Sequence, residues 1–227
     1  YYKVFETDDR TVKAYHFTEK DFSCDPKVFA LNVLIGKGRA SRSTAVLYSM
    51  KCIKENNLRF PLGKISEDFF FNLDFLAVAG KISVYKKPSL YNLKREGSLS
   101  ASYHKGFFDT ILEMDEKVKE FTTKIDNKKY KEYIGNKRYS LLVKNTLVYA
   151  MSIMKSEQEP YGERVALCIS IFENSRVKEA VSEMSEAPFF PGRAKTAFVK
   201  LLFGMVKKNM YRLACFTAYI AFKLAGV

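Results

Sequence analysis

The sequence predicts an α/β fold in its first part and a mostly helical region after it. Short runs rich in aromatic and β-branched residues occur at 1–5, 11–17, 81–85 and 88–93, separated by turn-forming and helical stretches. From Tyr103 onward the pattern is almost entirely helical, with its clearest breaks at 126–127 and 159–162. We therefore expect an α/β portion over residues 1–102 and a helical portion over residues 103–227.

Within the first portion, residues 1–5 and 11–17 are expected to form a hairpin, with Asp8 and Asp9 as solvated turn residues. Helices are expected over 25–35, 43–56 and 69–79, the last of them ending at Gly80 as a C-terminal cap. A short strand is expected over 81–85. An extended segment over 88–93 and a polar loop over 94–98 follow it.

The composition is that of a folded, strongly basic protein. Of its 227 residues 47% are hydrophobic, and the formal net charge is +13. Such a charge favours an anionic partner, which could be nucleic acid, a membrane surface or a phosphorylated substrate. The four cysteines and two histidines are scattered, so we expect buried thiols in a reducing compartment and neither a zinc site nor a disulfide framework.

The adjacent acids Glu67 and Asp68 are the leading catalytic candidates. They precede the apolar run 69–79, which places them at the start of a helix. A purely structural interpretation also exists, because acids in a first helical turn complement the helix dipole and Ser66 could serve as the N-cap. The pair by itself does not choose between the two interpretations.

The surrounding sequence resembles family 2 glycosyltransferases, which have the GT-A fold. Residues 58–73 match the family pattern (R)FP-x-G-x-x-x-ED-x-x-F, and residues 91–100 match its Y-x-x-x-R-x-x-S-x-S loop. Residues 81–88 are similar to the short strand between these motifs. The resemblance covers about residues 1–102 and implies a partial GT-A-like mixed sheet with helices.

The resemblance implies an inverting transfer of a sugar from a nucleotide-sugar donor to a saccharide or lipid-linked saccharide acceptor in the synthesis of cell-surface polysaccharide. Asp68 occupies the position of the general base, which removes the acceptor hydroxyl proton, and Glu67 would orient the acceptor or the base. Arg95, Ser98 and Ser100 would stabilise the leaving diphosphate. A surface arginine in a polar turn is the alternative for Arg95.

One departure from the family is marked. Its members carry an Asp-x-Asp motif that binds Mg²⁺ or Mn²⁺ against the donor diphosphate, and this chain has no counterpart of it. Because residues 1–5 read like the interior of a sheet, we expect the donor and metal side to lie upstream of Tyr1. The chain alone is then expected to be inactive. The expected location is the cytoplasm, peripherally at the inner face of the cell membrane.

Residues 188–227 form a basic tail that contains no acid. We expect one amphipathic helix over 196–223, lying on an anionic membrane surface with its basic residues on the headgroups. The apolar, charge-free stretch 213–222 is too short to span a bilayer. A helix packed on its own domain with a solvated basic face is the alternative for this tail.

Two other functions compete with the enzyme: a non-catalytic basic module that binds an anionic membrane or another polyanion, and a helical scaffold built on residues 103–227. We expect no nucleic-acid partner, because the chain carries no helix-turn-helix, RNA-binding aromatic signature or zinc finger. The glycine-containing stretch 36–44 fits neither common phosphate-loop pattern, so it could be a basic substrate loop or a solvated connection.

Overall fold

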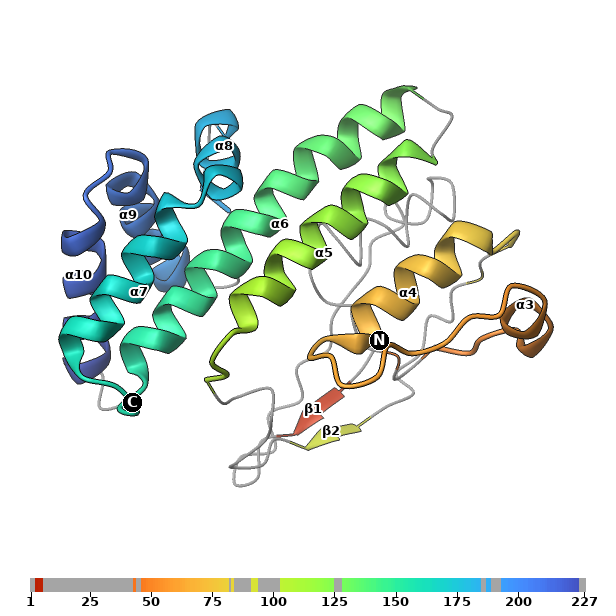
Figure 1. Cartoon of the computed structure of the whole chain (residues 1–227), viewed down its shortest axis with the longest axis horizontal. Helices are drawn as coiled ribbons and strands as arrows, with labels where there is room; N and C mark the ends of the chain where they lie inside the picture. Colours follow the sequence, from red (N-terminus) through yellow and green to blue (C-terminus); the bar gives the residue numbers. More distant parts are fainter. Residues whose placement is uncertain are drawn as a thin grey trace. The chain divides into compact units, whose positions relative to one another are not determined.

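The structure is a computed structural model that describes residues 3–5, 43, 46–81, 83, 91–93, 103–124, 128–184, 187–188 and 193–224. The chain divides into two compact units. Unit 1 comprises Tyr1–Ser102 together with Glu116–Ile134, and unit 2 comprises Tyr103–Asp115 together with Gly135–Val227. Helices α5 (Phe107–Thr123) and α6 (Lys128–Lys155), both labelled in Figure 1, contribute residues to both units.

The α/β prediction, with its GT-A-like mixed sheet, is wrong for the part of the chain that the structure describes. That part consists of eight helices, α3 to α10. Its only strands are β1 (Lys3–Phe5) and β2 (Tyr91–Leu93), a single parallel pair in which Lys3 lies opposite Tyr91. A run such as 81–85, with two alternating apolar positions, specifies no sheet partner. Lys81 and Ser83, its two described residues, lie outside any strand.

Several predicted elements fall beyond the described ranges. Residues 11–17, the helix predicted over 25–35 and most of the loop over 36–44 are among them. The parallel pairing of β1 with β2 was not expected, since the sequence suggested an antiparallel hairpin partner for residues 1–5.

Helix α3 (Met50–Glu55) is shorter than the predicted 43–56. Ser49 caps it by accepting a hydrogen bond from the Cys52 amide at 3.3 Å. The preceding residues Val46 and Leu47 are 41% and 101% exposed, so no packing holds this part of the apolar pattern in a helix.

Helix α4 (Glu67–Val78) confirms the helix predicted after Ser66 and begins two residues earlier than expected. It buries Phe69, Phe70, Phe71 and Leu73 in unit 1, and Asp74 pairs with Lys117 of α5 at 2.7 Å. The predicted cap at Gly80 is wrong, because the helix ends at Val78, the extended Ala79 follows it, and Gly80 does not take a left-handed conformation.

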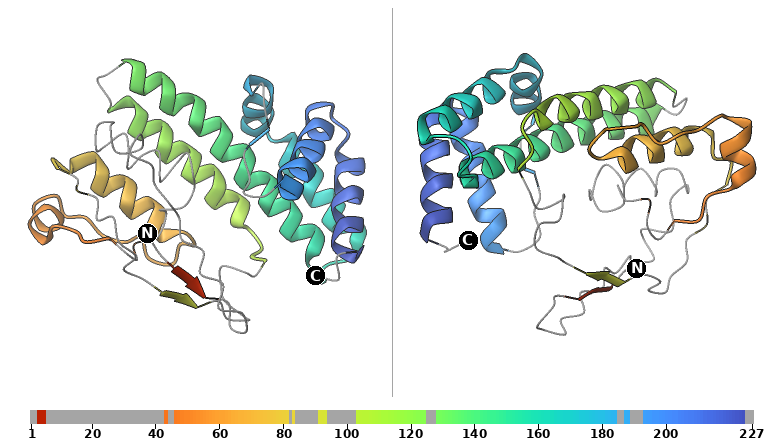
Figure 2. Two further views of the ribbon diagram at one scale, coloured as in Figure 1. Left: turned by 180° about the vertical axis from the view of Figure 1, so that it is seen from behind. Right: turned by 60° about the horizontal axis from the view of Figure 1, so that its bottom comes forward.

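Unit 2 is helical, as the sequence predicts. Helices α5 and α6 run side by side (Figures 1 and 2), followed by α7 (Tyr161–Glu173), α8 (Ser175–Glu183), α9 (Arg193–Lys207) and α10 (Tyr211–Leu224). The predicted break at 159–162 is confirmed, since Pro160 immediately precedes α7. The break at 126–127 lies outside the described residues.

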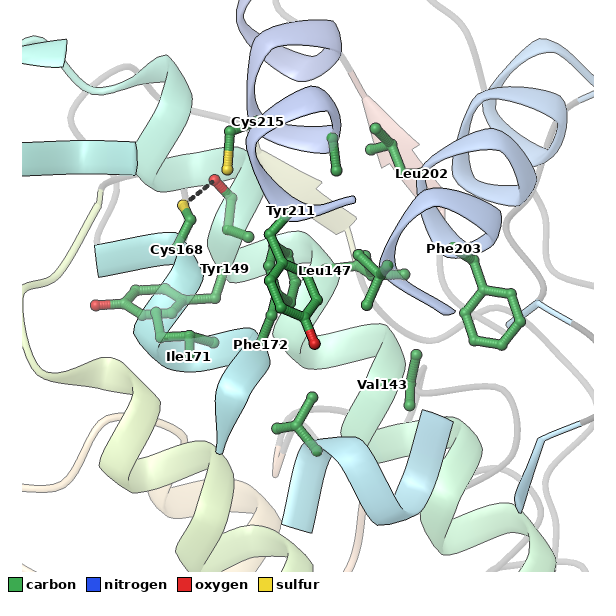
Figure 3. Close-up of a cluster of buried hydrophobic side chains, with 14 of the residues drawn as sticks. Val143, Leu147, Tyr149, Cys168, Ile171, Phe172, Leu202, Phe203, Tyr211 and Cys215 are labelled. Atoms are coloured by element: carbon green, nitrogen blue, oxygen red, sulfur yellow. Dashed lines mark hydrogen bonds between the residues drawn. The ribbon is translucent and has the colours of Figure 1, made fainter. Parts of the chain in front are cut away.

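The core of unit 2 draws buried side chains from all of its helices. Figure 3 labels members of it from α6, α7, α9 and α10. In this core Tyr211 of α10 stacks on Phe172 of α7, with 5.7 Å between the ring centroids. The buried Cys168 thiol donates to the Ala150 carbonyl, and its hydrogen bond with Cys215 together with burial raises its pKa. These two thiols therefore behave as small apolar core side chains, which confirms the prediction of buried thiols for this pair.

The single tail helix predicted over 196–223 is wrong. The chain turns at Lys208–Met210, between α9 and α10, which lie next to each other (Figure 2). Asn209 is left-handed at φ 58°, and the Met210 amide bonds back to the Met205 carbonyl at 2.9 Å, a helix-ending motif that asparagine accommodates. Among the described helices, none has the length and apolarity needed to cross a membrane.

Candidate acidic site at the start of helix α4

The candidate site is formed where the chain enters α4. Glu67 and Asp68 are the first two residues of the helix, so their negative charges lie at the positive end of its dipole. Glu67 is exposed and Asp68 is half-buried. The two acids therefore differ in environment although they are adjacent, and Asp68 is the one held against the rest of unit 1.

Aromatic stacking holds the approach to the acids in place. The ring of Phe60 lies parallel to that of Phe71, with 4.0 Å between centroids and 9° between planes. This contact fastens the loop that precedes α4 onto the second turn of the helix. Lys64, later in the same loop, places its ammonium 5.2 Å from the centroid of the Phe70 ring.

Tyr48 completes the site from the segment before α3. Its ring meets Phe71 and Phe75 edge-on, at 5.2 Å and 5.0 Å. Its hydroxyl donates to Oδ1 of the buried Asn72 at 2.6 Å. Burial, and after it the negative charge of Asp68, raise the pKa of Tyr48 to about 12. The phenol therefore stays protonated, and the charge of Asp68 acts on it.

The backbone in front of the acids is in an unusual conformation. Ser66 is left-handed, with φ 65° and ψ 31°, and its side chain makes no capping hydrogen bond, so the expected serine cap is absent. A non-glycine residue in this region costs about 1–2 kcal/mol. The Ser66 carbonyl accepts a hydrogen bond from the Phe69 amide at 2.9 Å. Such conformations concentrate at functional sites, where neighbouring contacts maintain them.

We expect Tyr48→Phe to lower the free energy of unfolding by about 0.5–1.5 kcal/mol, because it removes the hydrogen bond to Asn72. The effect should also depend on pH. The folded state keeps the Tyr48 proton to about pH 12, whereas the unfolded state loses it near 10.0, so wild-type stability falls across this interval as pH rises. Urea titrations across this range should show a shallower fall for the variant, and parallel curves would contradict the assignment.

The structure brings only part of the predicted site together. Glu67 and Asp68 share one helix turn, but Arg95, Ser98 and Ser100 lie outside the described residues. Within the described ranges no group of three or more acidic, histidine or cysteine side chains could hold a metal ion. The described residues thus do not fit the Mg²⁺ or Mn²⁺ that the resemblance implies.

Sequence reasoning missed Tyr48 and Asn72 as members of the site. Tyr48 was assigned to a helix that does not reach it, and its partner lies 24 positions further along the chain. The Phe71 and Phe75 pair, at helical spacing, was visible in the sequence. Nothing in the sequence indicated which ring would pack against it.

Unit 2 carries a concavity whose lining contains none of the predicted site residues. It is an open groove of about 420 Å³ along α7. Glu173 and Arg212 are the charged residues of its lining, and Tyr161, Val165 and Ile169 supply apolar surface. Glu173 is the one carboxylate of its lining, so the groove does not repeat the acid pair found at the start of α4.

Comparison with known proteins adds nothing to this description: no protein-family model, no curated protein and no solved structure matches the chain.

Proposed function

We propose that the protein takes part in sugar transfer, with Asp68 as the general base. The acceptor would be a saccharide or a lipid-linked saccharide, and the donor a nucleotide-sugar. The observation that carries the proposal is the setting of the acid pair: Asp68 is half-buried at the N-terminus of α4 beside the Tyr48 phenol, and Glu67 is exposed next to it. The motif around the pair, residues 58–73, supplies the class of reaction.

The proposed step uses this chain's own groups. Asp68 accepts the proton of the acceptor hydroxyl as that oxygen attacks the anomeric carbon, and the nucleoside diphosphate leaves from the opposite face with the bonding electrons. General-base catalysis of this kind requires a carboxylate within hydrogen-bond reach of the hydroxyl. Glu67, on the solvent side, would bind acceptor hydroxyls. Arg95, Ser98 and Ser100 remain the proposed contacts of the diphosphate.

The test compares cells that express the protein from its own gene with cells that lack this gene. Membranes from wild-type cells and from cells lacking its gene are incubated with a panel of labelled nucleotide-sugars, and label in lipid-linked and polymeric saccharide is counted. We expect at least one donor to label saccharide only when the gene is present. Identical labelling by every donor, with identical surface polysaccharide in both strains, would rule the proposal out.

A further inference from the structure

Helices α9 and α10 carry a surface that the core of unit 2 does not use. We call it the basic–apolar surface. It consists of exposed residues of α9, α10 and the turn between them: Lys200, Leu201, Lys207, Lys208, Met210, Arg212, Leu213, Phe216 and Ile220.

The opposite faces of α9 and α10 are buried in the core of unit 2. Val199, Leu202, Phe203 and Val206 of α9 are buried, as are Tyr211, Ala214, Cys215 and Ala218 of α10. On α10 the exposed apolar positions are Leu213, Phe216 and Ile220, which follow a helical spacing and form a second stripe. These residues are 42%, 51% and 37% exposed, so a substantial part of their apolar surface is left in contact with water.

The charged residues in the part of the sequence that contains α9 and α10 are all positive. After Glu186 the sequence contains no further acid, whereas seven cations follow: Arg193, Lys195, Lys200, Lys207, Lys208, Arg212 and Lys223. Lys207 donates to the Met184 carbonyl, a neutral group. Glu173 of α7 lines the same groove as Arg212. The surface as a whole therefore presents excess positive charge.

Cations and apolar side chains are closest together at the turn. Lys207, Lys208, Met210, Arg212 and Leu213 fall within seven consecutive residues and are all exposed. Such a mixture matches the boundary of a lipid bilayer, where phosphate headgroups lie just above acyl chains. A nucleic acid would favour aromatic rings for base stacking, and Phe216 is the one aromatic member of this surface.

We propose that the basic–apolar surface docks on an anionic lipid bilayer. Lys200, Lys208 and Arg212 contact the headgroup phosphates, and Leu213, Phe216 and Ile220 enter the upper part of the acyl layer. The docking is peripheral and depends on the helix pair being folded on its unit. It goes beyond the proposed sugar transfer and does not require it, because the binding assay contains no sugar donor.

The test is sedimentation of the full chain with vesicles of phosphatidylcholine, alone or mixed in equal parts with phosphatidylglycerol. Wild-type protein should sediment with the anionic vesicles and remain in solution with the neutral ones, and added salt should release it. The double variant Lys208→Glu/Arg212→Glu should bind at least about 25-fold more weakly, since each cation strengthens binding roughly fivefold. Phe216→Ser should weaken binding on its own.

Matched controls separate the surface from net charge. Lys155→Glu/Lys178→Glu makes the same change in charge at exposed positions of α6 and α8, and Val148→Ser removes an exposed apolar side chain from α6. Both should bind like wild type, and all variants should keep the wild-type circular dichroism spectrum. The proposal fails if neutral vesicles bind equally well or if the controls lose as much binding. It also fails if the protein binds single-stranded RNA at salt concentrations that abolish vesicle binding.

Discussion

Replacing Asp68 by asparagine should reduce sugar transfer by about 10²–10⁴-fold, the usual contribution of a positioned general base. The substitution keeps the size and shape of the side chain at the second position of α4 and removes its ability to accept a proton. Because the loss falls on the chemical step, kcat should drop while the KM for the acceptor changes little. The measurement is initial rates with the donor identified in the membrane assay.

The matched control is Asp109→Asn. Asp109 is an exposed acid in the first turn of α5, so it complements a helix dipole as Asp68 does but lies in another unit. Removing either charge should lower stability by roughly 0.3–1 kcal/mol, and only the Asp68 variant should lose transfer. If both variants transfer sugar at the wild-type rate, Asp68 is a helix-dipole residue and the base assignment is wrong.

Much of α4 could be predicted because its signals are local. Acids followed by a phenylalanine-rich run place a helix start within two residues, and the structure begins α4 at Glu67. The contacts that set the environment of Asp68 are not local. Phe60 reaches Phe71 across the intervening loop and Tyr48 reaches Asn72, and no spacing rule encodes either pairing.

The errors in fold class have a common physical origin. A five-residue alternating run such as 81–85 is compatible with a strand but does not specify which strand it pairs with. A strand that has no pairing partner is not stable. In the tail, apolar residues recur on both sides of Asn209 and hid the turn there, although asparagine is a recognised residue for the left-handed end of a helix. The helical character of unit 2 was predictable because helical spacing of apolar residues is a local signal that requires no knowledge of the packing partner.

Replacing Asp115 by alanine should lower the free energy of unfolding by about 3–5 kcal/mol, the cost of breaking a buried ion pair from one side. Asp115 lies on the buried face of α5, between Ile111 and Val118, and its side chain is 3% exposed. One carboxylate oxygen lies 3.4 Å from Nε of Arg138, and the other accepts from Arg176. Without the carboxylate, the largely buried Arg138 keeps its charge and loses this contact.

Urea unfolding of the full chain, followed by circular dichroism, measures the change. Asp109→Ala on the same helix is the control, since its side chain is exposed and its removal should change stability by no more than about 1 kcal/mol. A cost below about 1 kcal/mol for Asp115→Ala would mean that water or other groups replace the carboxylate, and the pair would then behave as a surface salt bridge.

A triple variant of the same three residues should have the opposite result, and it distinguishes the contribution of charge pairing from that of packing. Changing Asp115 to leucine together with Arg138 and Arg176 to methionine removes all three charges and keeps apolar volume between α5, α6 and α8. Because buried ions gain from one another little more than they lose on leaving water, this triple variant should be within about 1–2 kcal/mol of wild type or more stable. If it is instead as unstable as Asp115→Ala, the ion group contributes stability that apolar side chains at these positions do not restore.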